Sequence, residues 1–223
     1  MKRVLTGIAA AFLLLISGSG AAWGEEGARV EMGIKMWLNN WRHNDPRLAE
    51  NIRSDYAALL GPAIEAKFGD RLIAEASFLF SVTDYTFSNS NTINDGRQDV
   101  DIAIGYLIVP NFGVLAGYKD TSLREKETGI TQTLAGPLVG VVAHVPVDQE
   151  TSFYTRLNYL FIRHKESGVT EDSPGWNFEF GIRYAYTRDF AGTLGYKYET
   201  NTGRDSNVED SFSGLTLGAM FAF

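Results

Sequence analysis

The sequence predicts an all-β fold, an antiparallel up-and-down barrel of ten strands. Three observations support this prediction: apolar and polar residues alternate along most of the chain, short turns alternate with long polar loops, and the last segment is strongly amphipathic. Alternation with period two puts successive side chains on opposite faces of a strand. Each segment therefore has one apolar face and one polar or small face, as the wall of a barrel requires.

The expected strands are defined by this alternation and by turn-type residues between them. The segment 176–187 is the clearest, because Trp176 and Phe178 share one face and Glu179 lies on the other. The segment 131–145 is apolar on both faces, so its phase stays open. The ten expected strands are 30–38, 57–68, 71–82, 98–109, 112–120, 131–145, 151–163, 176–187, 190–199 and 211–223. The alternative architecture has eight strands.

Two prolines lie within the expected strands. Pro62 and Pro137 cannot donate a ladder hydrogen bond, so we expect bulges near the loop ends of their strands. Each follows a glycine, and Leu60-Gly61-Pro62 is similar to Ala135-Gly136-Pro137. This weak repeat indicates either a duplicated hairpin pair or the general likeness of barrel hairpins.

The connections differ in length in a regular way. Four are short and rich in turn formers: 69–70, 110–111, 146–150 and 188–189. Five are long and polar: 39–56, 83–97, 121–130, 164–175 and 200–210. Short turns on one side and long loops on the other are typical of barrels in bacterial outer membranes, and an even strand number puts both termini on the short-turn side.

The N-terminal residues are those of an export signal. Lys2 and Arg3 precede an apolar stretch at 4–16 and small residues at 17–24, which predicts a signal peptide at 1–24 and a barrel domain at 25–223. The chain has 27 acidic against 20 basic residues, which argues against a nucleic-acid partner. It contains no cysteine, so disulfides and thiolate zinc sites are excluded. No motif indicates a metal site or a cofactor.

The closing segment adds a location. Thr216, Gly218, Phe221 and Phe223 form a pattern that resembles the C-terminal strand signal of Gram-negative outer-membrane β-barrels. The resemblance implies a transmembrane barrel in the outer membrane, recognised by the barrel-insertion machinery and surrounded by lipid and lipopolysaccharide. It does not imply a particular activity or an oligomeric state.

In a membrane barrel the apolar face is turned outward. Aromatic residues near strand ends, such as Tyr106, Phe112, Phe153 and Trp176, fit an interfacial girdle. The polar face carries many glycines, which suit a narrow lumen. The opposite orientation would give a secreted soluble ligand-binding barrel. The residues expected to face the lumen are Glu31, Lys35, Glu65, Lys67, Glu75, Asp99, Asp101, Lys119, Arg156, Glu179, Arg183, Lys197 and Glu199.

Acids and bases are nearly balanced in this set, so we expect ion pairs that fill the interior. The leading functional expectation is a non-enzymatic protein, either structural or giving passage to small solutes and ions, with exposed loops. Arginines of the first loop, Arg42, Arg47 and Arg53, would engage lipopolysaccharide phosphates or belong to a solvated loop of mixed charge.

The alternative is a surface hydrolase. Asp99 and Asp101 point inward near an outer strand end, and His164 could lie at the same rim. This set is similar to the paired acids and acid–histidine pair of omptin proteases, and would activate a water. For a lipid A-modifying enzyme the candidate is His43 with Ser54 or Asp55. His144, flanked by valines, is expected to be a packed or interfacial residue.

Overall fold

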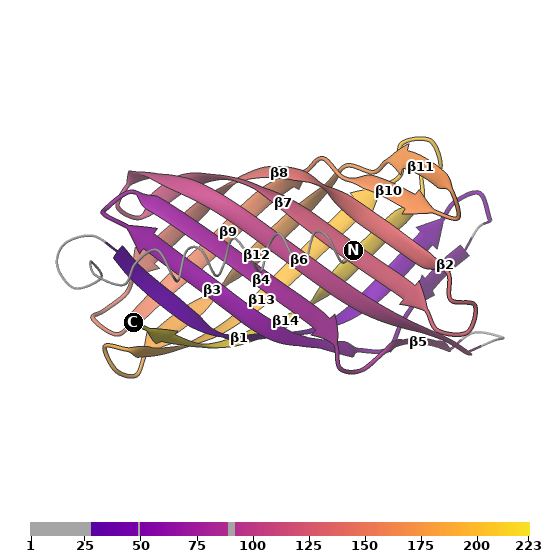
Figure 1. Cartoon of the computed structure of the whole chain (residues 1–223). Coiled ribbons are helices and arrows are strands. Elements are labelled where there is room, and N and C mark those ends of the chain that lie inside the picture. Colours follow the sequence, from indigo (N-terminus) through magenta and orange to yellow (C-terminus); the bar gives the residue numbers. More distant parts are fainter. Residues whose placement is uncertain (1–27, 49, 89–91) are drawn as a thin grey trace.

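Ten long strands close into a single antiparallel barrel in the computed structural model, which describes residues 28–48, 50–88 and 92–223. Each strand pairs with the next along the wall, and β14 pairs with β1 to close it (Figure 1). The strands are β1 (Ala28–Asp45), β3 (Ala57–Phe68), β4 (Leu72–Ser81), β6 (Thr92–Val109), β7 (Phe112–Glu125), β8 (Thr131–Pro146), β9 (Thr151–Leu160), β12 (Gly175–Ala185), β13 (Phe190–Thr202) and β14 (Glu209–Ala222). The prediction of ten strands is confirmed; the expected signal peptide at 1–24 lies outside the described residues.

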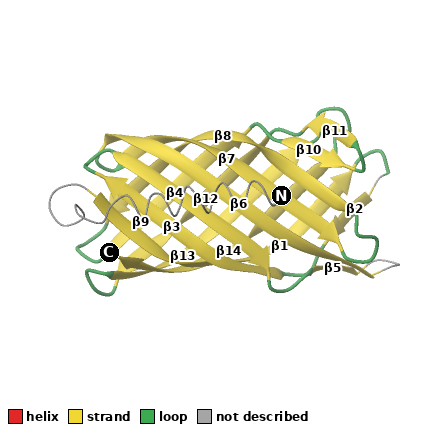
Figure 2. Ribbon diagram, viewed as in Figure 1, coloured by secondary structure: helices red, strands yellow, loops and turns green. Residues whose placement is uncertain are grey.

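Four short strands extend the wall at the end opposite the C-terminus (Figures 1 and 2). They are β2 (Glu50–Arg53), β5 (Tyr85–Ser88), β10 (Arg163–Glu166) and β11 (Val169–Asp172). β2 pairs with the end of β1, β5 with the start of β6, and β10 with β8. Much of the expected loops 39–56, 83–97, 121–130 and 164–175 is therefore strand, because the hairpins continue and keep their backbone groups hydrogen-bonded.

The outward face of the barrel is apolar. Ile104, Phe153 and Leu215 are 67, 50 and 51% exposed, whereas Lys119 and Asp99, on the other face, are 0% exposed. Charged side chains thus line the interior and apolar ones cover the outside. This orientation is the reverse of a soluble barrel, so the expectation of a secreted soluble barrel is wrong. The described residues include no helix long and apolar enough to cross a membrane.

The phase of β8, open in the sequence, is settled by its contacts. Leu134, Leu138 and Val142 are buried inside, and Val139 and Val145 are exposed outside. The inward leucines and valine belong to apolar clusters, so the inner face of β8 is apolar where other strands carry charged side chains.

At both strand prolines the pairing with one neighbouring strand is interrupted. The β3–β4 register skips Gly61 and Pro62. Pro137 lies where β8 changes partner from β9 to β10, and its carbonyl accepts a 2.9 Å bond from the Phe161 backbone N–H. Both lie toward the long-loop end, so the expected irregularities occur where proline removes a donor.

The filling of the barrel changes along its axis. Toward the long-loop end the lumen is packed by apolar and aromatic side chains: Trp37, Trp41, Leu59, Leu79, Tyr85, Phe87, Leu123, Leu134, Leu138, Leu160, Ile162 and Phe212. Charged residues occupy the middle, and a cavity opens toward the short turns. This gradient places two candidate sites, one in the middle and one at the outer mouth.

Candidate functional site

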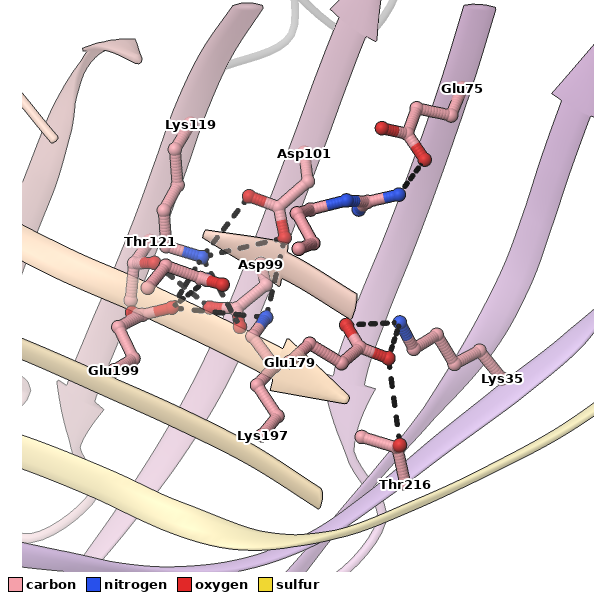
Figure 3. A network of polar contacts seen from close by, with 12 residues as sticks. Lys35, Glu75, Asp99, Asp101, Lys119, Thr121, Glu179, Lys197, Glu199 and Thr216 are labelled. Atoms are coloured by element: carbon pink, nitrogen blue, oxygen red, sulfur yellow. Dashed lines mark hydrogen bonds and ion pairs between the residues drawn. The ribbon is translucent and has the colours of Figure 1, made fainter. Parts of the chain in front are cut away.

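A layer of buried charges crosses the middle of the lumen (Figure 3). It joins three carboxylates to three cations and is called the charged layer: Asp99, Asp101, Glu199, Arg97, Lys119 and Lys197. The Lys119 Nζ lies 3.1 Å from both Asp101 and Glu199. Because charges removed from water are tolerated only when paired, the equal numbers of each sign explain why this layer is stable.

Arg97 holds the layer to the apolar packing above it. Its guanidinium donates to Asp99 at 2.7 and 2.9 Å and to Glu199 at 2.9 Å. It also lies 3.9 Å from the centre of the Phe212 ring and 4.9 Å from that of Trp37. A planar guanidinium can satisfy carboxylates at its edge and stack on rings with its face, which an ammonium cannot. The residue therefore joins both halves of the lumen filling.

A second set of ion pairs lies below the charged layer. Lys35 donates to both carboxylate oxygens of Glu179, at 2.8 and 2.9 Å, and Thr216 contacts the same carboxylate (Figure 3). Arg156 bonds to Glu75 across the lumen. A cavity of only about 60 Å³ separates these groups, enough for a few waters. The two sets of ion pairs together leave no wide passage among the described residues.

The interior is hollow nearer the short turns. A cavity of about 370 Å³ is lined by Glu31, Glu65, Arg183, His144 and Tyr154, among others. It ends at Glu75, Arg156 and Glu179, below the charged layer. This is a vestibule closed at its inner limit by ion pairs.

A histidine–aspartate pair lies near the outer mouth. His43 Nδ1 is 2.8 Å from the Asp210 Oδ1, and the Trp41 Nε1 donates to the same oxygen at 2.7 Å. β1 and β14 place His43 directly opposite Asp210. Trp41 packs on Phe87 and Phe212, with ring centres 5.1 and 5.5 Å apart, which fixes the pair from below.

Beside this pair an outer pocket of about 190 Å³ opens at the mouth. Part of its lining is apolar or aromatic, with Trp41 and Phe87, and part is acidic, with Asp95, Glu125 and Glu166, which we call the acidic wall. Burial raises the pKa of Asp95 to about 6, reinforced by four nearby acids. Asp95 lies in the part of β6 that pairs with β5, beyond the apolar band that begins at Val100 on the outer face.

A polar groove of about 280 Å³ lies on the outside of the same end. Arg42 and Arg53 are directly opposite each other on β1 and β2, and both line it together with Asn44 and Ser213. Like charges placed side by side on a strand pair repel each other unless an anion bridges them. The lining also holds Glu209, so two arginines against one carboxylate leave the groove with a net positive charge that suits an anionic group.

The structure separates the three residues of the hydrolase hypothesis. Asp99 and Asp101 are paired with Arg97, Lys119 and Lys197, and His164 Nδ1 faces Glu171 at 3.7 Å. In the strand register His164 is opposite Leu134, Leu134 is opposite Thr121, and Thr121 is opposite Asp99. Three strand spacings, or about 14 Å along the wall, therefore separate His164 from Asp99. The acids and this histidine do not share a site.

The other named candidates are also placed. Ser54 accepts a bond from the Trp41 backbone N–H at 2.9 Å and donates to the Asp55 carbonyl, so it serves the wall rather than His43. All thirteen residues expected in the lumen lie on inward-facing positions of their strands. Of the closing pattern, Thr216 and Gly218 face inward, while Phe221 and Phe223 are exposed on the outside.

Several important residues lie in segments that the sequence predicts as loops. Arg97, Asp95, Trp41 and Asp210 all lie on strand extensions and are at least 93% buried. The sequence spacing could have placed two of them: Arg97 and Asp95 precede Asp99 and Asp101 at intervals of two and therefore share their inward face. The outward residues between Asp95 and Asp99 are polar or glycine, because the outward face beyond the membrane contacts water. The alternation of apolar and polar residues is therefore absent from this segment.

The family model described as the outer membrane protein beta-barrel domain matches residues 8–223. The chain belongs to this outer-membrane β-barrel family. It is therefore a protein of the outer membrane, as the closing strand and the outward apolar face predict. No curated protein matches the sequence.

Several solved structures have a barrel similar to that of this protein at low sequence identity. The outer membrane protease OmpT from Escherichia coli has a TM-score of 0.60 and 11% identity, covering 92% of this chain and 99% of that one. Ail of Yersinia pestis has a TM-score of 0.40 and 14% identity over 89% of this chain and 100% of that one. An outer membrane channel from Pseudomonas putida F1 has a TM-score of 0.48 and 13% identity over 89 and 96%. At these identities the likeness to OmpT concerns the fold alone.

Proposed function

We propose that this protein is a non-conducting outer-membrane barrel that anchors a functional surface at its outer mouth. The charged layer carries the proposal, because it fills the lumen with side chains bound to one another rather than to a passing ion. Above it the lumen is packed by the aromatic cluster. A solute in the vestibule would have to break several buried ion pairs to go further.

The outer groove gives this surface a lipid partner. Arg42 and Arg53 lie just beyond the apolar outward residues of β1, which end at Leu38, and so at the level of lipid headgroups. Two guanidinium groups are well suited to bind phosphate by paired hydrogen bonds. We therefore assign lipopolysaccharide phosphates as the ligand of this groove, and the barrel-insertion machinery as the partner of Phe221 and Phe223.

Conductance of the refolded protein in planar bilayers tests the proposal. We expect no steady current from the wild-type barrel at any holding voltage. A triple variant, Arg97→Ser, Asp99→Ser and Lys119→Ser, truncates three of the six side chains of the charged layer and should give measurable current. Heat-modifiable migration in gels verifies that each protein is folded. Stable wild-type channels would refute the closed lumen.

A second candidate function is hydrolysis at the mouth. The His43–Asp210 pair favours it, because a carboxylate bonded to Nδ1 orients a histidine to take a proton from water or a hydroxyl. Purified protein would be incubated with fluorogenic peptides and with lipid A. Activity lost in His43→Ala and kept in His144→Ala would support this function. Equal turnover in both variants would exclude the pair as its site.

A further inference from the structure

The acidic wall of the outer pocket holds a carboxylate that the protein itself does not neutralise. Asp95 is 7% exposed and lines the pocket. Among the side chains that the structure describes, none donates a hydrogen bond to its carboxylate and none forms an ion pair with it. A buried carboxylate in this condition is unfavourable, and a cation entering the pocket would relieve it.

The neighbouring acids are no better compensated. Glu125 accepts a bond from the Thr128 hydroxyl and Glu166 one of 3.0 Å from the Gln132 amide, so both partners are neutral. In the described chain the lysine closest in sequence, Lys126, is bound to Asp84 at 2.5 Å instead. Three carboxylates therefore line one pocket, and none of the described basic side chains is paired with them.

The apolar part of the pocket lining indicates the rest of the ligand. Trp41, Phe87, Ile52 and Leu123 give an apolar and aromatic surface. Such a surface suits an apolar stem, and the ring faces attract a cationic group. A bare metal ion would gain nothing from this surface, and the described acids are not grouped as metal ligands.

We propose that the outer pocket binds an amphipathic organic cation, an ammonium or guanidinium group carried on an apolar stem, with Asp95 as its main counter-charge. Both an arginine or lysine side chain of a peptide and a free polyamine have this chemistry. The site is independent of the closed lumen and would bind its ligand whether or not the barrel conducts.

Titration calorimetry with benzamidine as the probe tests the site. Benzamidine carries a planar cation on an aromatic ring, and benzamide is its neutral match. We expect benzamidine to bind at least about tenfold more tightly than benzamide, the lower end of the contribution of a bond to a charged group. Equal affinity for the two compounds would overturn the proposal.

Substitution assigns the binding to Asp95. Asp95→Asn should weaken benzamidine binding about tenfold or more, whereas Asp148→Asn, in a turn at the other end of the barrel, should leave it unchanged. Folding of both variants is checked by heat-modifiable migration. If Asp95→Asn folds and binds as the wild type does, the pocket is not the site. An arginine tripeptide and spermidine, compared in the same assay, identify the source of the cation by the tighter binder.

Binding should also depend on pH. The groups around Asp95 are Asp84 with Lys126, Glu125, Glu127, Glu166, His43 and, on its own strand, Arg97. Only the ionised carboxylate attracts a cation, so affinity for benzamidine should rise between pH 5 and pH 7. Asp95→Asn should lose most of this rise. A wild-type affinity that is constant over this range would contradict the role of Asp95.

Discussion

Replacing Arg97 with methionine should strongly destabilise the barrel. Arg97 is 1% exposed and is bonded to both Asp99 and Glu199. Methionine preserves much of the packing on Phe212 but leaves the charged layer with one unbalanced carboxylate. Removing one partner of a buried ion network costs about 3–5 kcal/mol. With a urea dependence of about 2 kcal/mol per molar, the unfolding midpoint should fall by about 2 M.

Urea titration of the protein refolded in detergent measures this change, with folded and unfolded forms separated by gel mobility. Arg163→Met is the matched control. The Arg163 side chain is 77% exposed and its Nε lies 3.7 Å from the Asp172 carboxylate. Exposed ion pairs of this kind contribute at most about 1 kcal/mol to stability. Arg97→Met combined with Glu199→Gln restores equal charge and should recover part of the loss. A midpoint for Arg97→Met within about 0.5 M of the wild type would refute the idea that the layer depends on charge balance.

Three further predictions concern other parts of the chain. The pKa of Asp95 is raised from 3.8 to about 6, so its contribution to stability is complete below about pH 4 and is lost as the pH rises through 6. The free energy of unfolding from urea titrations should be roughly 1 kcal/mol lower at pH 7.5 than at pH 5 in the wild type, and this difference should shrink in Asp95→Asn. Gly214→Val should prevent closure between β14 and β1, because a Cβ at Gly214 would lie 1.8 Å from the Leu38 carbonyl oxygen; the heat-modifiable band should disappear, whereas Gly96→Val should keep it, because the nearest atom to a Cβ at Gly96, the Asp84 Oδ1, is 4.0 Å away. Phe223→Ala should lower the amount assembled in the outer membrane of cells while refolding in detergent stays unchanged; equal loss in both assays would show a purely structural role for the aromatic ring.

The sequence was sufficient to predict the barrel because its membrane-spanning part is under a strong physical constraint. Lipid requires an apolar outward face, and the narrow interior requires paired charges or small residues, so period two is visible in every strand except β8. β8 faces other apolar side chains inside the barrel, at Leu134 and Leu138, and this contact removed the contrast between its two faces.

The outer mouth could not be predicted in the same way. Beyond the membrane both faces of a strand can be polar, so β2, β5, β10 and β11 are indistinguishable from loops in the sequence. The pairing of His43 with Asp210 depends on barrel closure between β1 and β14, which are separated by 167 residues at this point. Asp99 and Asp101 lie on inward-facing positions of β6, but their partners Lys119 and Lys197 come from β7 and β13, and these contacts determine what the two acids can do.

The length of β1 has a consequence for access. Its 18 residues are far more than the nine to eleven needed to cross a bilayer, and the excess lies on the outer side, where Asn40, Arg42 and Asn44 replace apolar residues. At about 3.3 Å per residue and a tilt near 40°, the mouth stands roughly 15–20 Å above the hydrocarbon region. That height is within the sugar layer of the outer leaflet. Molecules reaching the rim must first diffuse between saccharide chains, a sieve that small, flexible compounds pass more easily than folded proteins.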